Sequence, residues 1–396
     1  MIIKSSSGCS FGLVGRPATT RMNRRFVNLV THNWVEGVYS VRRINPYNHL
    51  FYPSAKAALE AADEAAKYKD YFPVMQSLQL PDPGIKFTAT PSGGGLDMFA
   101  LFNPRGTSEG RIVFSNSIGE AVLYDADKQL FNTMGCLNEP KGADPMCLPI
   151  EHPGTDQDSL YVLDSCPWKA DSRCFEVLEF MPECSELSNL RATWRWRLLP
   201  PPPFVRQPGY KPSSVLSYTT TVDSYGFSTI YISCEGSIGT YSFQTAHHDS
   251  KHRLGWSHSE EWKHVGKWKL PFNGRAQYIP EFNLWFGFSA IWPNNLCAVD
   301  LSAMVHEQTP TEQQAWQDLN PPEGVAWIPI RRELLNLGDG KFVIAKTFKA
   351  ESTGQQFAVL TGVEMMHGVG DDQTLQMVKH KCARYAFTTD AIKWVL

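Results

Sequence analysis

Three histidines and an aspartate that lie close together are the side chains best suited to hold a metal ion. His247, His248, Asp249 and His252 fall within one short stretch, and histidines at such spacings can share a zinc ion when their loop has the right shape. The surrounding sequence, HHDSKHRLGWSHSEE, is polar, and no cysteine stands at ligand spacing from it. We therefore predict a solvated loop there, with no metal site and no cofactor.

The segment Gly8-Cys9-Ser10-Phe11-Gly12 has the Gly-x-Ser-x-Gly pattern of a nucleophilic serine. That chemistry requires a buried strand before the serine and a helix after it. Here the motif stands in a basic, serine-rich start, residues 1–24, which we expect to be a disordered leader. Gly-x-Gly-x-x-Gly, Walker A and His-Glu-x-x-His motifs are absent. The sequence thus assigns no catalytic residue.

Basic and aromatic side chains alternate in the stretch RATWRWR, residues 191–197. Such a pattern could bind single-stranded nucleic acid, but a half-buried strand with outward arginines has the same period of two. The net charge of the chain is −3, so we expect a strand and no nucleic-acid partner. The proline run 200–203 could bind an aromatic groove, and we interpret it instead as the end of a strand.

Three tryptophans, Trp34, Trp256 and Trp292, fall in loops between expected strands. Aromatic side chains on loops are frequent anchors for protein partners, although they can equally pack against a neighbouring strand. We predict these three as partner-binding residues.

Composition limits the environment of the protein. The nine cysteines are scattered without a Cys-x-x-Cys motif, and no secretory signal is visible, so we expect free thiols in a reducing compartment, the cytoplasm or nucleus. The basic start also allows an organellar transit peptide. No apolar run approaches eighteen residues, so we expect no membrane span.

Short apolar strands separated by turn residues must position any site. Between Trp262 and Ala303, turns are predicted at Phe272–Arg275, where Asn-Gly favours φ > 0, at Pro280–Asn283 and at Pro293–Asn295. A helix is predicted from Ser54, as its N-cap, to Tyr68. Since it stands among strands, we interpret this helix as an insertion.

The predicted strands form a repeating pattern, in which one strand of each repeat ends in leucine and proline. The prolines at 81, 140, 200, 271 and 321 are separated by 59, 60, 71 and 50 residues. A period of this size with about four strands is typical of a β-propeller. We predict an all-β, six-bladed propeller over residues 25–387, with a tail at 388–396. Five or seven blades, or two β-sandwich domains, are the alternatives. The expected blades are 26–83, 84–140, 145–204, 213–272, 275–322 and 326–387.

Several motifs in order carry a resemblance to a known family. They include FVNLV, FYP at 51–53, LLPPPPFV, VGKWKLPF, YIPEFNLWFG, LCAVDLSA, LTGVE and MVKHK. Over residues 25–382 the chain resembles a plant family, expanded in grasses, that is known as domain of unknown function 1668. The resemblance implies repeats like those of kelch-type or F-box-associated propellers, and it implies no activity or site residue. Kelch-type propellers often follow an F-box, which is a helical segment. Strand-like sequence begins here at Arg25, so we see no F-box.

We expect a non-enzymatic protein-interaction platform whose protein partner the sequence does not identify. Two alternatives stay open, namely a hydrolase or lyase with polar residues converging at the channel, and a carbohydrate-binding propeller. Converging carboxylates or histidines in one pocket would favour an enzyme, whereas exposed apolar or aromatic patches would favour a platform.

Overall fold

The computed structural model describes residues 24–67, 75–89, 94–102, 110–155, 157–168, 173–181, 193–248, 251, 255–302, 304, 308–310, 314–317, 327–368 and 374–396. Strands dominate this part of the chain, in agreement with the all-β prediction. The leader at 1–23, with its Gly-x-Ser-x-Gly motif, lies outside the described residues, as do Asp249 and His252.

Most described strands belong to six groups of four antiparallel strands, which we call units 1 to 6 and describe in spatial order. Unit 1 contains β27 (Asp390–Val395), β1 (Val27–Asn33), β2 (Val38–Ile44) and β4 (Ile85–Thr88). Unit 2 contains β5 (Leu96–Leu101), β6 (Arg111–Asn116), β7 (Ala121–Asp125) and β8 (Leu130–Thr133). Unit 3 contains β9 (Met146–Ile150), β10 (Ser159–Leu163), β11 (Phe175–Met181) and β12 (Thr193–Leu198).

The second half of the chain repeats this arrangement. Unit 4 contains β13 (Val215–Val222), β14 (Ser228–Cys234), β15 (Gly239–Gln244) and β18 (Glu261–Gly266). Unit 5 contains β19 (Phe272–Ile279), β20 (Leu284–Ser289), β21 (Leu296–Val299) and β22 (Gln314–Trp316). Unit 6 contains β23 (Trp327–Gly338), β24 (Lys341–Ala350), β25 (Gln356–His367) and β26 (Leu375–Ala386). The expected strand at 193–197 is thus present as β12.

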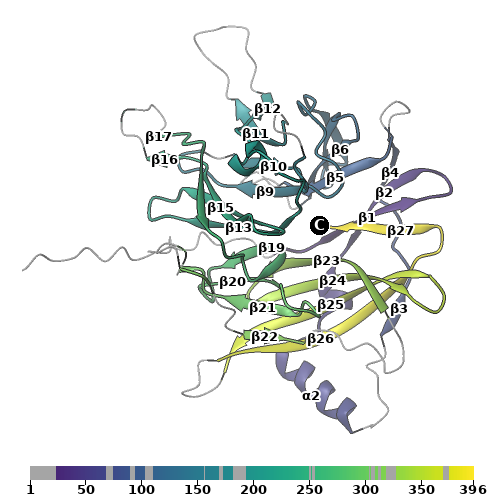
Figure 1. The fold of residues 1–396 in the computed structure, drawn as a ribbon. Coiled ribbons are helices and arrows are strands. Elements are labelled where there is room, and N and C mark those ends of the chain that lie inside the picture. The colour runs from purple at the N-terminus through teal and green to yellow at the C-terminus, as the bar shows by residue number, and fades with distance from the viewer. Residues whose placement is uncertain are drawn as a thin grey trace, which may run out of the picture.

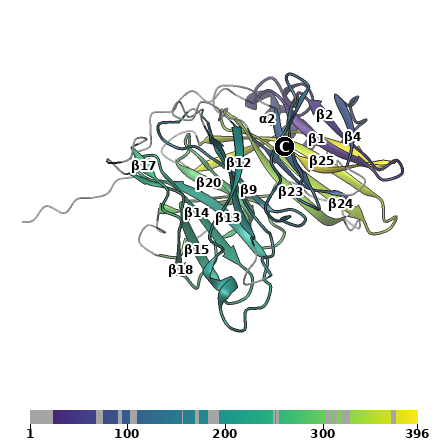
Figure 2. The same cartoon turned by 90° about the horizontal axis from the view of Figure 1, so that it is seen from above.

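The units surround a common centre. Figure 1 shows β5, β9, β13, β19, β23 and β27, the first strand of each unit, nearest that centre. The first strands of units 4 and 5 pair in parallel, Ser217 with Gly274 and Tyr218 with Arg275, which joins these units into one eight-stranded sheet. The view from above in Figure 2 shows the four strands of unit 4 side by side in one arm of the molecule.

Apolar side chains fill the space between each unit and the next. In β1, Leu29 packs into the cluster shared with unit 6, while Val30 packs into the cluster shared with unit 2. Neighbouring side chains of a strand point to opposite faces of its sheet, so a strand buried on both faces reads as a continuous apolar run. Similar clusters join units 2 with 3, 3 with 4, 4 with 5, and 5 with 6.

Unit 1 combines the two ends of the described chain, and here the structure differs from the sequence-based bounds. Residues 388–396, expected as a tail, contain β27, in which Ile392 pairs with Thr31 and Val395 with Leu29. The fourth strand, β4, begins at Ile85, beyond the expected limit of 83. Pairing between the chain ends is a long-range contact, which no local pattern specifies.

The predicted helix is confirmed as α2 (Ala55–Ala66), and Ser54 Oγ accepts a hydrogen bond of 3.2 Å from Ala57 N. It follows the short α1 (Pro46–His49), precedes β3 (Gln76–Leu78), and contacts β26. Since β3 pairs in parallel with β26, the insertion within unit 1 extends across to unit 6. No described helix is long and apolar enough to cross a membrane.

One predicted turn is wrong. Asn273-Gly274 lies inside β19, where the register against β20 shifts between Asn273 and Gln277. Gly274 has φ +81°, so its conformational freedom serves a β-bulge instead of a hairpin. The turn at Pro280–Asn283 is present, with Phe282 N donating to Ile279 O at 3.1 Å.

Candidate functional site

One end of the molecule is built from the turns that join the second strand of a unit to its third. In units 1 to 5 this turn is hydrogen-bonded to the segment that enters the first strand of the same unit. The five pairs are Trp34 N with Thr389 O at 3.3 Å, Ser117 N with Gly95 O at 3.2 Å, Ser165 Oγ with Ala143 O at 3.1 Å, Glu235 N with Ser214 O at 2.9 Å, and Ala290 N with Pro271 O at 2.9 Å.

Contacts between units show that these turns share one face. Leu96 N, at the start of unit 2, donates to the Tyr39 hydroxyl beside the turn of unit 1 at 3.1 Å. Leu137 N, on the way into unit 3, donates to Gly119 O in the turn of unit 2, and Val215 N of unit 4 donates to Ser165 O in the turn of unit 3. The parallel pairing of β13 with β19 orients unit 5 like unit 4. We call residues 34–37, 117–120, 164–168, 235–238 and 290–295 the hairpin face.

Large apolar side chains on the hairpin face are open to solvent. Trp34 is 53%, Trp168 56% and Trp292 70% exposed, and these are the only exposed tryptophans of the described chain. Ile118 and two neighbours of the tryptophans, Val35 and Ile291, are also exposed. All three exposed tryptophans therefore project from one end of the molecule.

Polar side chains fix the backbone of these turns. Asn33 Oδ1 accepts hydrogen bonds from Val35 N at 3.1 Å and Glu36 N at 3.0 Å. In unit 5, Asn294 Nδ2 donates to Ser289 O at 2.8 Å, and Ser289 Oγ accepts from Ile291 N at 3.0 Å. Turns held in this way present their side chains at a low entropy cost, which favours binding.

The structure separates the three tryptophans predicted to bind a partner. Trp34 and Trp292 lie exposed on the hairpin face, whereas Trp256 is 7% exposed. It belongs to a small hairpin of β16 (His247–His248) and β17 (Trp256–Ser257) at the opposite end of unit 4. Its ring stacks on that of His152, with 4.9 Å between centroids and 9° between planes. Trp256 also packs with Phe227 and Ala246 of its own unit. The polar sequence around Trp256 gave no sign of this packing, because its partners are distant in the sequence.

Sequence reasoning missed Trp168. It follows Pro167 in the connection between two apolar strands, and this Pro-Trp pair in a loop is the signal that could have found it. In the structure, the hydroxyl of Tyr210 donates to Pro167 O at 2.6 Å and holds the turn against the segment that enters unit 4.

A second group of polar and charged side chains lies near the first strands, and we call it the central cluster. Asp144 precedes β9, while Arg331 and Glu333 lie on β23 and Trp394 on β27. The guanidinium of Arg331 forms an ion pair with Asp144, stands 3.7 Å from Glu333 Oε1, and lies over the Trp394 ring at 5.0 Å. The Tyr218 hydroxyl of β13 interacts electrostatically with Asp144 and Glu333. Residues from four units thus meet here.

Glu333 is the unusual member of the central cluster. Both carboxyl oxygens are closed to solvent and have no hydrogen-bond partner among the described residues, since 3.7 Å to Arg331 is too long for one. Burial raises the pKa of Glu333 to about 8, Arg331 opposes the rise, and Asp144 adds to it. The carboxyl is therefore protonated at neutral pH and can donate a proton or a hydrogen bond.

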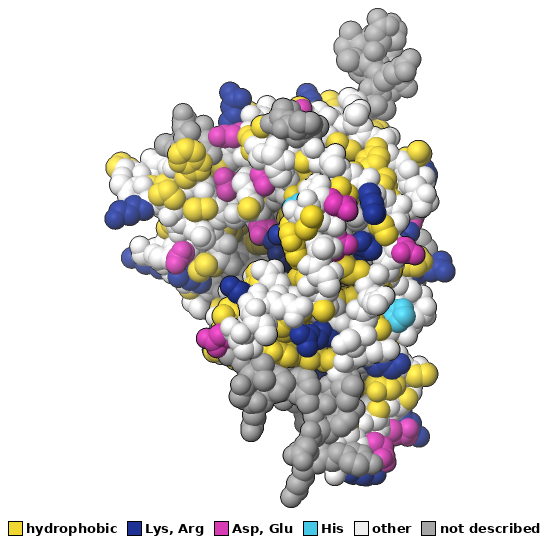
Figure 3. Space-filling view, turned by 90° about the vertical axis from the view of Figure 1, so that its right-hand side faces the viewer, with side chains coloured by type: hydrophobic (Ala, Val, Ile, Leu, Met, Phe, Trp, Pro, Cys, Tyr) yellow, Lys and Arg dark blue, Asp and Glu magenta, His cyan; other side chains and the backbone are white. Residues whose placement is uncertain are grey.

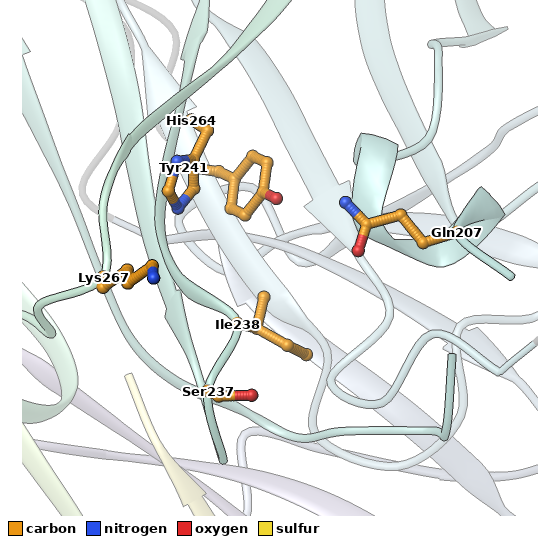
Figure 4. A pocket seen from close by; sticks show the side chains of 6 residues that line it. All are labelled: Gln207, Ser237, Ile238, Tyr241, His264 and Lys267. Atoms are coloured by element: carbon orange, nitrogen blue, oxygen red, sulfur yellow. The ribbon is translucent and has the colours of Figure 1, made fainter. Parts of the chain in front are cut away.

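A recess of about 400 Å³ opens beside the outer strands of unit 4, and Figure 4 shows the side chains around it. They are Gln207, Ser237, Ile238, Tyr241, His264 and Lys267. Gln207 follows the 3₁₀ turn η1 (Pro203–Arg206), Ser237 and Ile238 lie in the turn of unit 4, and the others lie on or after β15 and β18. The Tyr241 and His264 rings are 4.9 Å apart. We call this pocket the unit 4 recess.

Metal ligands do not gather in the part of the chain that the structure describes, where no group of three or more suitable side chains lies together. The seven described cysteines form no disulfide with one another. Figure 3 shows the side of the molecule that lies on the right in Figure 1, and hydrophobic side chains there form small groups separated by charged ones.

Comparison with known proteins places the sequence in one family. None of the curated proteins matches the chain. Among solved structures, the extracellular domain of a putative hybrid two-component system from B. thetaiotaomicron is similar with a TM-score of 0.31 and 10% identity, over 94% of this chain and 41% of that one. The family described as "Protein of unknown function (DUF1668)" matches residues 24–385. Since the match covers nearly the whole sequence, the chain belongs to this family.

Proposed function

We propose that the six units are the blades of one six-bladed propeller. Three observations support this: the first strands surround a common centre in Figure 1, apolar clusters join each unit to the next and unit 6 to unit 1, and β27 completes unit 1 from the far end of the chain. Pairing of the chain ends in one blade removes the open edge that a row of sheets would otherwise present.

We infer that this propeller is a non-enzymatic protein-interaction platform, and that the hairpin face is its docking surface. The observation that carries the inference is that all three exposed tryptophans lie on this face. Tryptophan is enriched among the residues that dominate binding energy, and truncating such an anchor costs about 2 kcal/mol or more. The described cysteines form no disulfide with one another, which fits the reducing compartment expected for the protein, and an intracellular location belongs to the same proposal.

Affinity purification of the tagged full-length protein from its native tissue, with mass spectrometry, tests the platform. The test variant is Trp34→Ala/Trp168→Ala/Trp292→Ala. The matched control is Leu59→Ala/Tyr225→Ala, which removes two exposed side chains from α2 and from the β13–β14 turn, away from the hairpin face. Circular dichroism and thermal unfolding establish that both variants are folded.

The platform proposal expects a partner that the intact protein and the control retain and the tryptophan variant loses. A partner that the tryptophan variant retains in full would refute the exposed tryptophans of the hairpin face as the docking surface.

Catalysis at the central cluster is the second candidate, because Glu333 combines a protonated carboxyl with a neighbouring guanidinium. A general acid of a hydrolase or lyase needs a carboxyl that is protonated near neutral pH, and a guanidinium beside it could hold an anionic substrate group. Thermal-shift screening of a metabolite collection, with Glu333→Gln as control, tests it. A compound that stabilises the native protein and not the variant would support this candidate, and the absence of any such compound would count against it.

A further inference from the structure

We propose that the unit 4 recess binds an acidic segment of the partner protein, with a carboxylate held at Lys267. The proposal rests on the proposed function of the hairpin face and names the chemistry of its partner.

The recess opens on the hairpin face. Ser237 and Ile238 belong to the unit 4 turn, while Gln207 and Lys267 lie on the segments that lead into units 4 and 5. Those segments are bound to the same face, since Ser213 Oγ donates to Glu235 O at 3.1 Å and Ala290 N donates to Pro271 O at 2.9 Å. A partner that covers the hairpin face therefore also covers the recess.

Hydrogen-bond donors converge in the recess. In Figure 4 the Tyr241 hydroxyl points toward the Gln207 amide, and the ammonium of Lys267 lies across the opening from them. Tyr241 and Gln207 are hydrogen-bonded through their side chains. The Ser237 hydroxyl adds a further donor, and Ile238 supplies an apolar wall. A carboxylate accepts several hydrogen bonds and is attracted by the ammonium, which makes it the matching group.

Positive charge prevails in the segments that lead from the recess into units 4 and 5. Residues 203–214 and 262–271 contain no aspartate or glutamate, whereas the unit 4 turn contains one exposed carboxylate, Glu235, two residues before Ser237. Of the exposed cations on these two segments, Lys267 lines the recess, while Arg206, Lys211 and Lys269 lie nearby in the sequence. In a chain of net charge −3, the ammonium of Lys267 and the positive charge of the flanking segments attract an anionic partner.

The rest of the face argues for an acidic protein segment and against nucleic acid. Glu36, Glu120 and Asp164 lie in the turns of units 1 to 3. These carboxylates would repel a phosphate backbone that extended beyond the recess. A protein segment can place its acidic residues at the recess and apolar ones on Trp168, which lies on the neighbouring turn.

Fluorescence anisotropy with the full-length protein tests the proposal. The probe is a fluorescein-labelled peptide of ten glutamates, and ten-lysine peptide, ten-nucleotide oligothymidine and inorganic phosphate are the comparison ligands. The test variant is Lys267→Glu/Lys269→Glu. The matched control is Lys86→Glu/Lys349→Glu, which reverses two exposed lysines on β4 and β24.

We expect the glutamate peptide to bind the native protein and the control alike, to bind the test variant at least tenfold more weakly, and to dissociate as salt rises from 50 to 300 mM. Equal binding to native protein and test variant would overturn the proposal. Tighter binding of oligothymidine would indicate a nucleic-acid site instead, and displacement of the peptide by submillimolar phosphate would indicate a site for a small free anion, so either result would also overturn it.

Co-purification with the two variants distinguishes failure of the recess proposal from failure of the platform proposal. If the tryptophan variant loses the co-purified partner and Lys267→Glu/Lys269→Glu retains it, the platform stands and the recess proposal fails. If the charge-reversed variant loses the partner and the tryptophan variant retains it, the recess proposal stands and the apolar docking surface fails.

Discussion

Replacing Glu333 with glutamine should remove a dependence of stability on pH that the native protein has between pH 4.5 and 8. The carboxyl titrates at 4.5 in its ordinary environment and at about 8 in the folded protein, because burial disfavours its charged form. Between these values the folded state holds a proton that the unfolded state has released. The contribution of Glu333 to the free energy of unfolding is therefore fully present below pH 4.5 and is lost as pH rises toward 8.

The size of the effect follows from linkage. One proton bound only in the folded state changes the free energy of unfolding by about 1.4 kcal/mol per pH unit. Over the window from 4.5 to about 8, the contribution reaches about 5 kcal/mol. Glutamine matches the shape of the protonated carboxyl and does not titrate. The variant should equal the native protein near pH 5 and exceed it in stability above pH 8.

Urea unfolding of both proteins, monitored by tryptophan fluorescence at pH 5, 6, 7, 8 and 9, measures this difference. Other titrating groups cancel in the comparison, since both proteins contain them. Parallel stability curves for the two proteins across this range would refute the assignment of a buried, protonated Glu333.

Three further substitutions test the packing. Ile392→Asp buries a charge where β27 packs against unit 6, and urea unfolding should show a loss of about 3 kcal/mol or more; an unchanged midpoint would contradict the role of β27. Lys141→Met leaves Glu176, which is fully buried, without its ammonium partner, and should cost about 3–5 kcal/mol in urea unfolding. Lys141→Met/Glu176→Leu should not restore this loss, because Asn138 N and Glu139 N then lose the carboxylate that accepts their hydrogen bonds. Trp256→Ala removes the stack on His152 and should cost about 3–5 kcal/mol in thermal unfolding, yet leave partner capture intact; loss of the partner by a folded variant would argue against its structural role.

Local signals were sufficient for the helix and for most strands. Ser54 followed by alanines specifies the start of α2, and the run that ends in leucine and proline marks the outer strand β12 of unit 3. These features depend on neighbours in the sequence, so the sequence reveals them. The outer strands β8 and β18 end several residues before their prolines, at Thr133 and Gly266. The Asn-Gly pair in β19 misled the same reasoning, since its positive φ serves a bulge as well as a turn.

Features that depend on contacts between distant segments could not be read in this way. The pairing of β27 with β1 joins the two ends of the described chain, and Trp256 is buried against Phe227 of its own unit and His152 of unit 3. Glu333 and Asp144 are far apart in sequence and belong to the same cluster only because units 3 and 6 both face the centre. Two of the three predicted anchors, Trp34 and Trp292, are exposed as a docking surface requires, and their binding role stays a prediction.

Hydrogen–deuterium exchange of the full-length protein, free and bound to its captured partner, is the most direct test of the hairpin face. The account predicts slower exchange on binding in residues 34–37, 117–120, 164–168 and 290–295, and no change in the β13–β14 turn at 223–227 on the opposite end. Protection confined to that opposite end, with the hairpin face unchanged, would contradict the platform.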